Sequence, residues 1–452
     1  MTVSRDGSIS RALAEAALGW RWSDLPRPVQ RQTLRSLVNF FACALAGFRD
    51  PAVTTAARVF DRVGPAGSFT RIGSGLSASA LHAASLNAMA ANVFDFDDTH
   101  LPTIAHPTAP VAPVALALAQ TRRVSGIELL EAIAAGIELQ CRIALAISPG
   151  HYSRGWHITS TCGVFGAAMA AARLLGLNAS QTVWAFASAA VQGAGLVEAL
   201  GTMAKSLSVG NAASNGLLAA WLAEEGFAGP PAPLEGERGF VPVFGPAVNW
   251  EALADGLSER WEILANTFKP YPCGVVLNPV IEACLAVRAS VEQRLPEISR
   301  VELRAHPLLR ERTDRPGVSS GKLSQVSAQH AVAVSLIRGR AGLDEFSDAA
   351  VGDASLRAFE SRLSFIDDAS MRVEAAEVTL VMADGSRIVH RVDAAHGSLA
   401  SPLTDEELSA KCRELTRHGG SGVNVDALLD ALWSLEKAPD ASVLLSLAAG
   451  RC

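Results

Sequence analysis

The sequence predicts a mainly α-helical protein, in which an all-helical domain carries an inserted, smaller α+β lid domain. Three observations lead to this prediction. Apolar residues make up 49% of the 452 residues but aromatic residues only 6%, so alanine and leucine must fill the core, which favours closely packed helices. Apolar residues recur at steps of three and four through most of the first 265 residues. Segments that alternate as strands do appear later in the chain.

The N-terminal part contains a series of predicted helices with recognisable boundaries. The segment 29–47 ends in a glycine, and the segment 107–123 opens with prolines, which the first turn of a helix tolerates. Further helices are predicted over 77–94, 126–147, 161–177, 178–200 and 210–227. A loop rich in proline and glycine follows at 228–246.

After this loop the pattern of the sequence changes. Residues 296–309 and 375–397 alternate as strands do, and an Ala-Asp-Gly-Ser stretch in the second segment predicts a hairpin turn. Helices are predicted at 276–292, 325–340, 404–420 and 424–438. We therefore predict that the helical domain spans 1–265 and 402–452, and that the lid domain spans 266–401.

Composition excludes several classes of function. The formal charge of −6 provides no basic surface for nucleic acid. The most apolar stretches contain charged residues, as 129–147 does, and are too polar for a membrane span. Seven cysteines without a C-x-x-C pair indicate reduced thiols and no zinc site. Because the N-terminus also lacks a signal-peptide pattern, we expect a cytoplasmic protein with no membrane or nucleic-acid partner.

Lysine and tyrosine are rare, which directs attention to the few that occur. A chain that carries most of its positive charge on arginine keeps lysine where a compact ammonium group is needed. The lysines are Lys205, Lys269, Lys322, Lys411 and Lys437, and the tyrosines are Tyr152 and Tyr271.

The first cluster of polar residues is DFDDTHLPTIAHP at 95–107, between two predicted helices. Three aspartates and two histidines can support acid–base chemistry or bind a divalent metal. Because no H-x-x-x-H spacing is present, we favour acid–base chemistry over a metal site. The alternative is that the aspartates only form a helix cap.

Two further clusters lie at predicted helix starts. His157 precedes an apolar helix, and the positive end of that helix favours the neutral, basic form of the imidazole. Lys205 precedes a glycine and a helix expected to begin near Asn211, where exposed N–H groups suit a carboxylate or phosphate. Each also has a purely structural interpretation.

The remaining clusters lie in the predicted lid. Lys269 and Tyr271 are held among prolines, which fix the backbone and also suit a hinge. Lys322 and His330 form a weaker candidate, since both residues suit the solvated face of a helix.

Taken together, these segments resemble the MmgE/PrpD family, whose members include 2-methylcitrate dehydratase, cis-aconitate decarboxylase and iminodisuccinate epimerase. The resemblance runs from about residue 8 to 440 and rests on DFDDTH…HP, GWHITSTCGVFGAAMAAARLLGL, KSLSVGNAASNGLLAA…GFAGP…LEGERGF and KPYPCG. It implies a helical domain with an α+β lid, no metal or organic cofactor, and a homodimer formed through the helical domain. The mean hydropathy of +0.23 also favours a homodimer.

The resemblance also implies an active site. The family's acidic motif matches Asp95 and Thr99, its following histidine matches His106, and its Lys-Pro motif matches Lys269. The catalytic candidates are Asp95, His106, His157 and Lys205, and the candidates for substrate binding are Thr99, Tyr152, Lys269, Tyr271 and Lys322. The loop 99–107 is one residue longer than the decarboxylase-like pattern, so the parts played by His100 and His106 stay open.

The chemistry shared by the family is removal of a proton beside a carboxylate, or its return to a carbanion. Two neutral histidines, His106 and His157, would act on opposite sides of the carbon, and Asp95 would orient a histidine. Lys205 and Lys269 would bind the carboxylates of a small di- or tricarboxylate and stabilise the enediolate.

We therefore expect a cofactor-independent lyase, most similar to 2-methylcitrate dehydratase. An isomerase similar to iminodisuccinate epimerase is the alternative, because 201–216 and 301–317 resemble that branch of the family. A lyase similar to cis-aconitate decarboxylase is a further alternative. A binding protein without catalysis is the least favoured interpretation.

Overall fold

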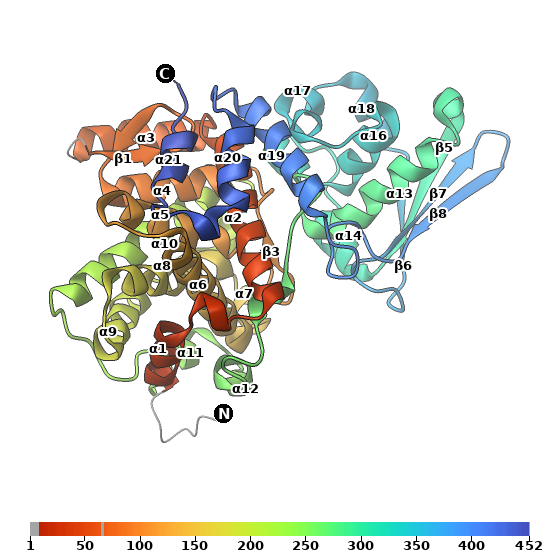
Figure 1. Ribbon diagram of the computed structural model, residues 1–452. Helices are drawn as coiled ribbons and strands as arrows, with labels where there is room; N and C mark the ends of the chain where they lie inside the picture. Colours follow the sequence, from red (N-terminus) through yellow and green to blue (C-terminus); the bar gives the residue numbers. More distant parts are fainter. Residues whose placement is uncertain (1–8, 65–66, 452) are drawn as a thin grey trace. The chain divides into compact units, whose positions relative to one another are not determined.

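The computed structural model describes residues 9–64 and 67–451, and it confirms the predicted mainly α-helical class (Figure 1). The chain divides into two compact units. Unit 1 contains the described residues up to Val93, then Asp97–Asn266, and the residues from Asp405 onward. Unit 2 contains Phe94–Phe96 and Thr267–Thr404.

Unit 1 is built from helices, with three short strand segments. Its helices are α1 (Ile9–Gly19), α2 (Arg27–Gly47), α3 (Pro51–Val63), α4 (Ala80–Asn92), α5 (Thr108–Thr121), α6 (Gly126–Ile147), α7 (Gly150–Ser153), α8 (Ile158–Leu175), α9 (Ala179–Ala190), α10 (Met203–Glu224), α11 (Phe240–Phe244), α12 (Trp250–Ala254), α19 (Asp405–Gly419), α20 (Val425–Trp433) and α21 (Val443–Ala448). Its strand segments are β1 (Phe69–Arg71), β2 (Leu76–Ala78) and β3 (Thr99–His100). The two-residue strand β4 (Asn266–Thr267) lies where the chain leaves this unit.

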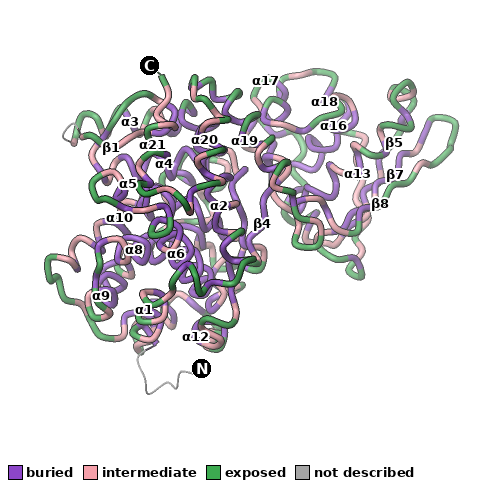
Figure 2. Tube along the Cα trace, in the orientation of Figure 1, coloured by how far each residue is buried: buried purple, intermediate pink, exposed green. Residues whose placement is uncertain are grey.

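Helix α8 forms the centre of unit 1 and packs against α5, α6 and α10 (Figures 1 and 2). Small side chains allow this close approach. A Cβ atom added at Gly136 of α6 would lie 2.6 Å from the carbonyl oxygen of Gly166 in α8. The helices therefore approach to backbone contact at this crossing, as the alanine-rich composition predicts.

Helix α8 is also the one helix, among the described residues, that is long and apolar enough to cross a membrane. However, 89% of its apolar window is buried inside the protein. Core helices pass the same test of length and composition, so this helix is weak support for a membrane span.

A fully buried ion pair fixes the last segment of unit 1 before the chain enters unit 2. Arg142 donates to Glu138 at 2.7 Å, one helical turn earlier in α6, and both side chains are inaccessible to solvent. The same guanidinium donates to the carbonyl oxygens of Asp255, Gly256 and Arg260. The segment leading to β4 is therefore held against α6 by charge-assisted hydrogen bonds.

Unit 2 contains a four-stranded sheet in the order β6-β5-β7-β8. Its strands are β5 (Ile298–Ala305), β6 (Leu363–Asp367), β7 (Ala376–Met382) and β8 (Arg387–Val392). Strands β5 and β6 are parallel, and the pairs β5–β7 and β7–β8 are antiparallel. The predicted hairpin is therefore confirmed, with its turn between Met382 and Arg387.

Unit 2 also contains several helices. They are α13 (Asn278–Arg288), α14 (Pro307–Thr313), α15 (Gly321–Ser324), α16 (Ala328–Arg338), α17 (Asp348–Val351) and α18 (Ala354–Glu360). Helix α13 packs on β7, β8 and α16, and α16 packs in turn on α18. The apolar residues of β5 and β7 share one buried core with α13 and α16 (Figure 2).

The largest differences from the predicted helix boundaries in unit 1 are at the end of α9 and at the start of α10. The helix expected over 178–200 ends at Ala190, because the glycines that follow break it and Gly195 adopts a φ of +149°. The helix expected to begin near Asn211 begins at Met203, where the Thr202 hydroxyl accepts a hydrogen bond from the N–H of Ala204. Lys205 is therefore in the first turn of α10, not before the helix.

We predict that Arg142→Leu lowers the free energy of unfolding by about 3–5 kcal/mol, because it leaves the carboxylate of Glu138 buried without a counter-charge. Arg122→Leu is the control, since the pair Arg122–Glu224 is exposed by 43% and 32% and contributes less than about 1 kcal/mol. Chemical denaturation followed by circular dichroism measures both. Equal effects of the two substitutions would contradict this account of the buried pair.

Candidate active site

The acidic segment after α4 places two consecutive aspartates inside unit 1. The carboxylate of Asp97 accepts a hydrogen bond of 2.8 Å from Asn92, the last residue of α4. The carboxylate of Asp98 accepts hydrogen bonds from the Thr108 hydroxyl and from the side-chain amide of Asn266. Both aspartates are almost inaccessible to solvent. The segment is therefore not a solvated helix cap.

Burial raises the pKa of Asp98 to about 7, although the hydrogen bonds from Thr108 and Asn266 oppose this shift. The neighbouring charge of Asp97 raises the pKa further. The second oxygen of Asp98, Oδ1, has no hydrogen-bond partner among the described residues. A carboxyl group in this position holds a proton near neutral pH more readily than an ordinary aspartate does.

The ring of His106 faces this segment with its Nδ1 atom. Nδ1 lies 2.9 Å from the backbone carbonyl oxygen of Asp98 and 3.2 Å from Oδ1 of Asp97. The Thr99 hydroxyl is 3.5 Å from the same nitrogen. A backbone carbonyl can only accept hydrogen bonds, so Nδ1 must carry the proton. In the neutral ring, the lone pair that can act as a base is therefore at Nε2.

His100 belongs to a different set of contacts. Its Nδ1 lies 2.8 Å from the Thr103 hydroxyl, and its Nε2 lies 3.4 Å from the carboxylate of Glu262. Burial raises the pKa of Glu262, but the hydrogen bond with His100 and the charge of Arg260 outweigh burial and lower it. His100 is completely buried, and both of its ring nitrogens face residues of the core.

His157 is the N-cap residue of α8, immediately before the first turn. Its Nδ1 lies 2.7 Å from the Ser160 hydroxyl, which lies 2.7 Å from the Ser208 hydroxyl of α10. The backbone N–H of His106 donates to the hydroxyl of Thr159, two residues after His157. Unit 1 therefore brings the segments of the two predicted histidines together at the start of α8.

Lys205 and Tyr152 are the other predicted residues of unit 1. Lys205 is buried in the first turn of α10, where the positive end of the helix adds to its charge. Its backbone carbonyl accepts a hydrogen bond from Ser208. Tyr152 is half-buried in the short helix α7, and the neighbouring His151 contacts the carbonyl oxygen of Phe244 and the Thr161 hydroxyl.

Two predicted residues form an ion pair within unit 2. The ammonium group of Lys269 lies 2.9 Å from the carboxylate of Asp95 and 2.7 Å from its backbone carbonyl oxygen. Lys269 is buried, so this carboxylate supplies the counter-charge that a buried ammonium group requires. Asp95 itself has a φ of +52°, a conformation that aspartate tolerates better than most residues.

Tyr271, Lys322 and His330 also lie in unit 2. Burial raises the pKa of the Tyr271 hydroxyl to about 12, so this group is protonated at neutral pH. Lys322 is half-buried in α15. The solvated helix face considered for His330 is wrong, because its ring is completely buried between the carboxylate of Glu360 and the carbonyl oxygen of Glu345.

The cysteines do not offer a nucleophile. The six described cysteines are free and buried, whereas Cys452 is outside the described residues. Burial raises the pKa of Cys43 and of Cys162 to about 12, which disfavours the reactive thiolate.

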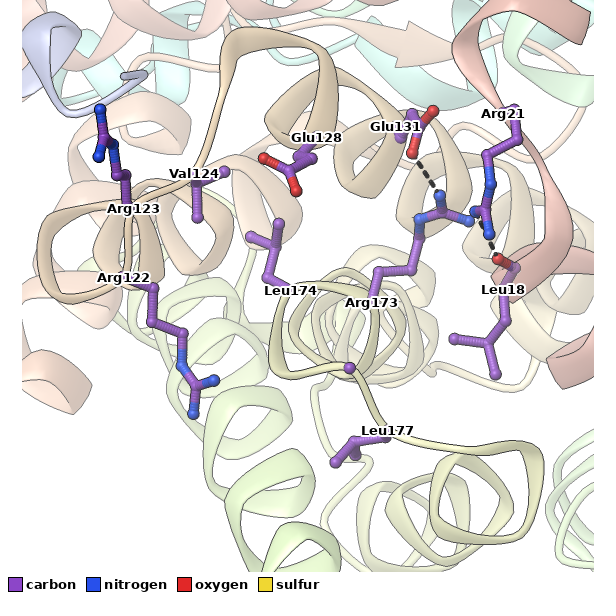
Figure 3. Close-up of a pocket in the computed structure, with 11 residues that line it drawn as sticks. Leu18, Arg21, Arg122, Arg123, Val124, Glu128, Glu131, Arg173, Leu174 and Leu177 are labelled. Carbon is purple, nitrogen blue, oxygen red and sulfur yellow. Dashed lines mark hydrogen bonds and ion pairs between the residues drawn. The ribbon is translucent and has the colours of Figure 1, made fainter. Parts of the chain in front are cut away.

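Unit 1 also has a cavity of about 860 Å³ at the far end of α8 from His157 (Figure 3). Two of its arginines bind backbone oxygens near the end of α1: Arg173 donates to the Trp20 carbonyl oxygen and pairs with Glu131 at 2.7 Å, and Arg21 donates to the carbonyl oxygen of Leu18. No candidate histidine or lysine lines this cavity. It is therefore separate from the candidate active site.

The residues around His106 could also be considered as metal ligands. Within unit 1, Asp97 and His106 offer one carboxylate oxygen and one ring nitrogen at 3.2 Å from each other. Structural zinc sites use four such ligands and catalytic sites three. Independence from a metal stays a prediction, for which a chelator provides the test.

Comparison with known proteins decides the family. A model of the MmgE/PrpD N-terminal domain matches residues 11–253, and a model of the MmgE/PrpD C-terminal domain matches residues 271–435. The chain belongs to the MmgE/PrpD family. The family resemblance predicted from the sequence motifs is therefore confirmed.

Several curated relatives within the MmgE/PrpD family are similar along most of their length. Cis-aconitate decarboxylase of Homo sapiens is 30% identical over 385 residues, which cover 82% of this chain and 79% of the relative. Cis-aconitate decarboxylase of Aspergillus terreus is 26% identical and covers 94% and 92%. A cis-aconitate decarboxylase-like protein of Aspergillus oryzae is 26% identical and covers 98% of both chains.

The structure adds contacts of residues to which the sequence motifs assigned no individual part. Asp97 and Asp98 hold the Nδ1 side of His106, and Ser160 and Ser208 adjoin His157. The sequence contains one signal for the first pair, namely the run of aspartates before His106. It contains none for Ser208, because only the packing of α10 against α8 brings that residue near.

We predict that the contribution of Asp98 to stability falls as the pH rises from about 4 to about 7, because burial raises the pKa of this group in the folded state. Folding binds a proton in this interval, so the contribution of Asp98 is complete below the unfolded pKa and is lost above about 7. Asp98→Asn should remove this part of the dependence, which we expect to be roughly 1–4 kcal/mol. Denaturation curves at pH 4.5 and 7.5 provide the measurement, and an unchanged difference between them in the variant would contradict the assignment.

Proposed function

We propose that the protein is a lyase that decarboxylates a small tricarboxylate of the cis-aconitate type. The observation that carries this proposal is the pairing of His106 with the carboxylate of Asp97, because such a histidine can hold the proton that a carbanion needs. The reaction and substrate class are supported by the names of the relatives. The sequence motifs favoured dehydration, with epimerisation as the alternative. Neither reaction is named for these relatives, so we propose decarboxylation instead.

The proposed reaction loses carbon dioxide and gains a proton. The bond between carbon and the departing carboxylate breaks, and its electron pair remains on the substrate as a carbanion that a neighbouring carboxylate stabilises. The imidazolium form of His106 then donates its Nε2 proton to carbon. Asp97 favours this form because an anion 3.2 Å from Nδ1 stabilises the positive charge of the ring.

The lysines are proposed to bind the carboxylates of the substrate. Lys205 suits this part because the residue lies in the first turn of α10, where the helix dipole also attracts anions. Lys269 is proposed for the same part because it is a lysine and matches the family motif. Asp95 supplies its counter-charge. Thr99, Tyr152, Tyr271 and Lys322 stay candidates for substrate binding.

The test is a panel of cis-aconitate, 2-methylcitrate and iminodisuccinate, followed by proton NMR in heavy water. A decarboxylase releases carbon dioxide and places one deuterium on carbon, whereas a dehydratase forms a double bond without gas, and an epimerase only exchanges a proton. We expect decarboxylation, unchanged by EDTA. His106→Gln should lower the rate by about 10²–10⁴. Turnover of another acid alone, or no turnover at all, would contradict the proposal.

We also propose that the protein forms a homodimer through the helical unit. The support is a strip of the sequence, from the end of α9 to the first turns of α10, that carries several exposed apolar side chains. Its members and their exposed fractions are Val191 (86%), Leu196 (57%), Leu200 (38%), Met203 (49%) and Leu207 (39%). Apolar surface left exposed on one protomer is typical of obligate dimer interfaces. A cytoplasmic location stays a prediction.

The expected result of light scattering is a particle of twice the chain mass of 47.3 kDa. The double variant Val191→Asp/Met203→Glu should shift the protein to the monomer, because buried charges destabilise an apolar interface. Val63→Glu is the matched control, since Val63 is 72% exposed at the end of α3 and outside the strip. A wild-type monomer, or an equal effect of the control, would overturn this proposal.

A further inference from the structure

Two serine hydroxyls connect the ring of His157 to the backbone of α10 through three successive contacts. The Nδ1 atom of His157 lies 2.7 Å from the Ser160 hydroxyl, and that hydroxyl lies 2.7 Å from the Ser208 hydroxyl. Ser208 lies 2.7 Å from the carbonyl oxygen of Lys205. These three contacts, which we call the serine chain, need one hydrogen each.

The direction of every hydrogen bond in the serine chain follows from its last member. A backbone carbonyl only accepts, so the single hydroxyl hydrogen of Ser208 is used on Lys205. The contact between the two serines then requires the hydrogen of Ser160. Because Ser160 has no second hydrogen, its contact with His157 requires a hydrogen on Nδ1 of the ring.

We infer that Ser160 and Ser208 are positioning residues that hold His157 as the tautomer with a proton on Nδ1. In this tautomer the lone pair of the neutral imidazole is at Nε2. The serine chain ends at a backbone carbonyl, which cannot release a proton, so it fixes the ring without carrying protons away. Its effect on catalysis rests on the proposed function, whereas its effect on the tautomer does not.

The packing around the serine chain fixes its members. His157 and Ser160 are almost inaccessible to solvent, and the backbone N–H of His157 donates to the Gly195 carbonyl oxygen at 3.0 Å. Gly195 has a φ of +149°, and a Cβ atom there would lie 2.7 Å from Cβ of Ser160. Only glycine allows the loop after α9 to approach this closely. The hydroxyl of Ser160 therefore has little freedom to find other partners.

The serine chain predicts that a substitution at Ser208 changes the tautomer of His157. Ser208 does not contact the imidazole, yet Ser208→Ala frees the hydrogen of Ser160, which can then be donated to Nδ1 of His157. The proton of the neutral ring then moves to Nε2, and the lone pair moves to Nδ1. Ser208→Thr keeps a hydroxyl in the same turn of α10 and should preserve the wild-type tautomer.

The experiment is NMR of ¹⁵N-histidine-labelled full-length protein, with the His157→Gln spectrum used to identify the signals of His157. We expect Nδ1 to be protonated in the wild type and in Ser208→Thr, and Nε2 to be protonated in Ser208→Ala. Ser214→Ala is the matched control, because Ser214 makes the same kind of contact with the carbonyl oxygen of Asn211 in α10. It should leave the signals unchanged.

Activity provides the second readout. Loss of a residue that orients a histidine reduces activity at metal sites by about 10–100-fold, and we expect a loss of this size in kcat for Ser160→Ala and Ser208→Ala. Thermal denaturation confirms that the variants are folded. Protonation of Nε2 in the neutral wild-type ring, or an unchanged tautomer in Ser208→Ala, would overturn the inference. A wild-type ring protonated on Nδ1 in a protein without activity on any acid would instead contradict only the proposed function.

Discussion

The arrangement of the candidate site depends on burial of the carboxyl group of Asp98. This group binds the Thr108 hydroxyl at the start of α5 and the amide of Asn266, where the chain leaves unit 1. The backbone carbonyl of the same residue accepts the Nδ1 proton of His106. A single residue therefore connects three segments that are distant in sequence. Burial raises the pKa of this carboxyl group to about 7.

The two candidate histidines have different surroundings. The Nδ1 of His106 faces the carboxylate of Asp97 in addition to the carbonyl of Asp98, whereas the Nδ1 of His157 faces the neutral hydroxyl of Ser160. A negative charge beside a ring stabilises its imidazolium form far more than a hydroxyl does. This contact supports the proposed part of His106 as the proton donor, a choice between the two histidines that the sequence left open.

The sequence predicted the class of fold because periodicity and composition report directly on packing. The hairpin of β7 and β8 and the long apolar helices followed from these patterns. The end of α9 did not, because the sequence pattern stays apolar through the glycines that follow Ala190. The start of α10 did not either, because Thr202 caps this helix ahead of the segment where the apolar pattern is clear.

For the candidate site, the sequence predicted residue types better than partners. The run of aspartates led to Asp95 as a candidate, and within unit 1 the structure adds the carboxylate of Asp97 beside His106. Ser208 is 48 residues from Ser160 and adjoins it only because α10 packs on α8. Pairings of this kind depend on tertiary contacts, and a single sequence does not encode them in any local spacing.

The most direct test of this account is ¹⁵N NMR that determines the neutral tautomers of His106 and His157 in the same sample. Both rings should carry their proton on Nδ1, His106 because Nδ1 faces the carbonyl oxygen of Asp98, and His157 because Nδ1 faces the Ser160 hydroxyl of the serine chain. Protonation of either neutral ring on Nε2 would contradict the arrangement of hydrogen bonds on which the account rests.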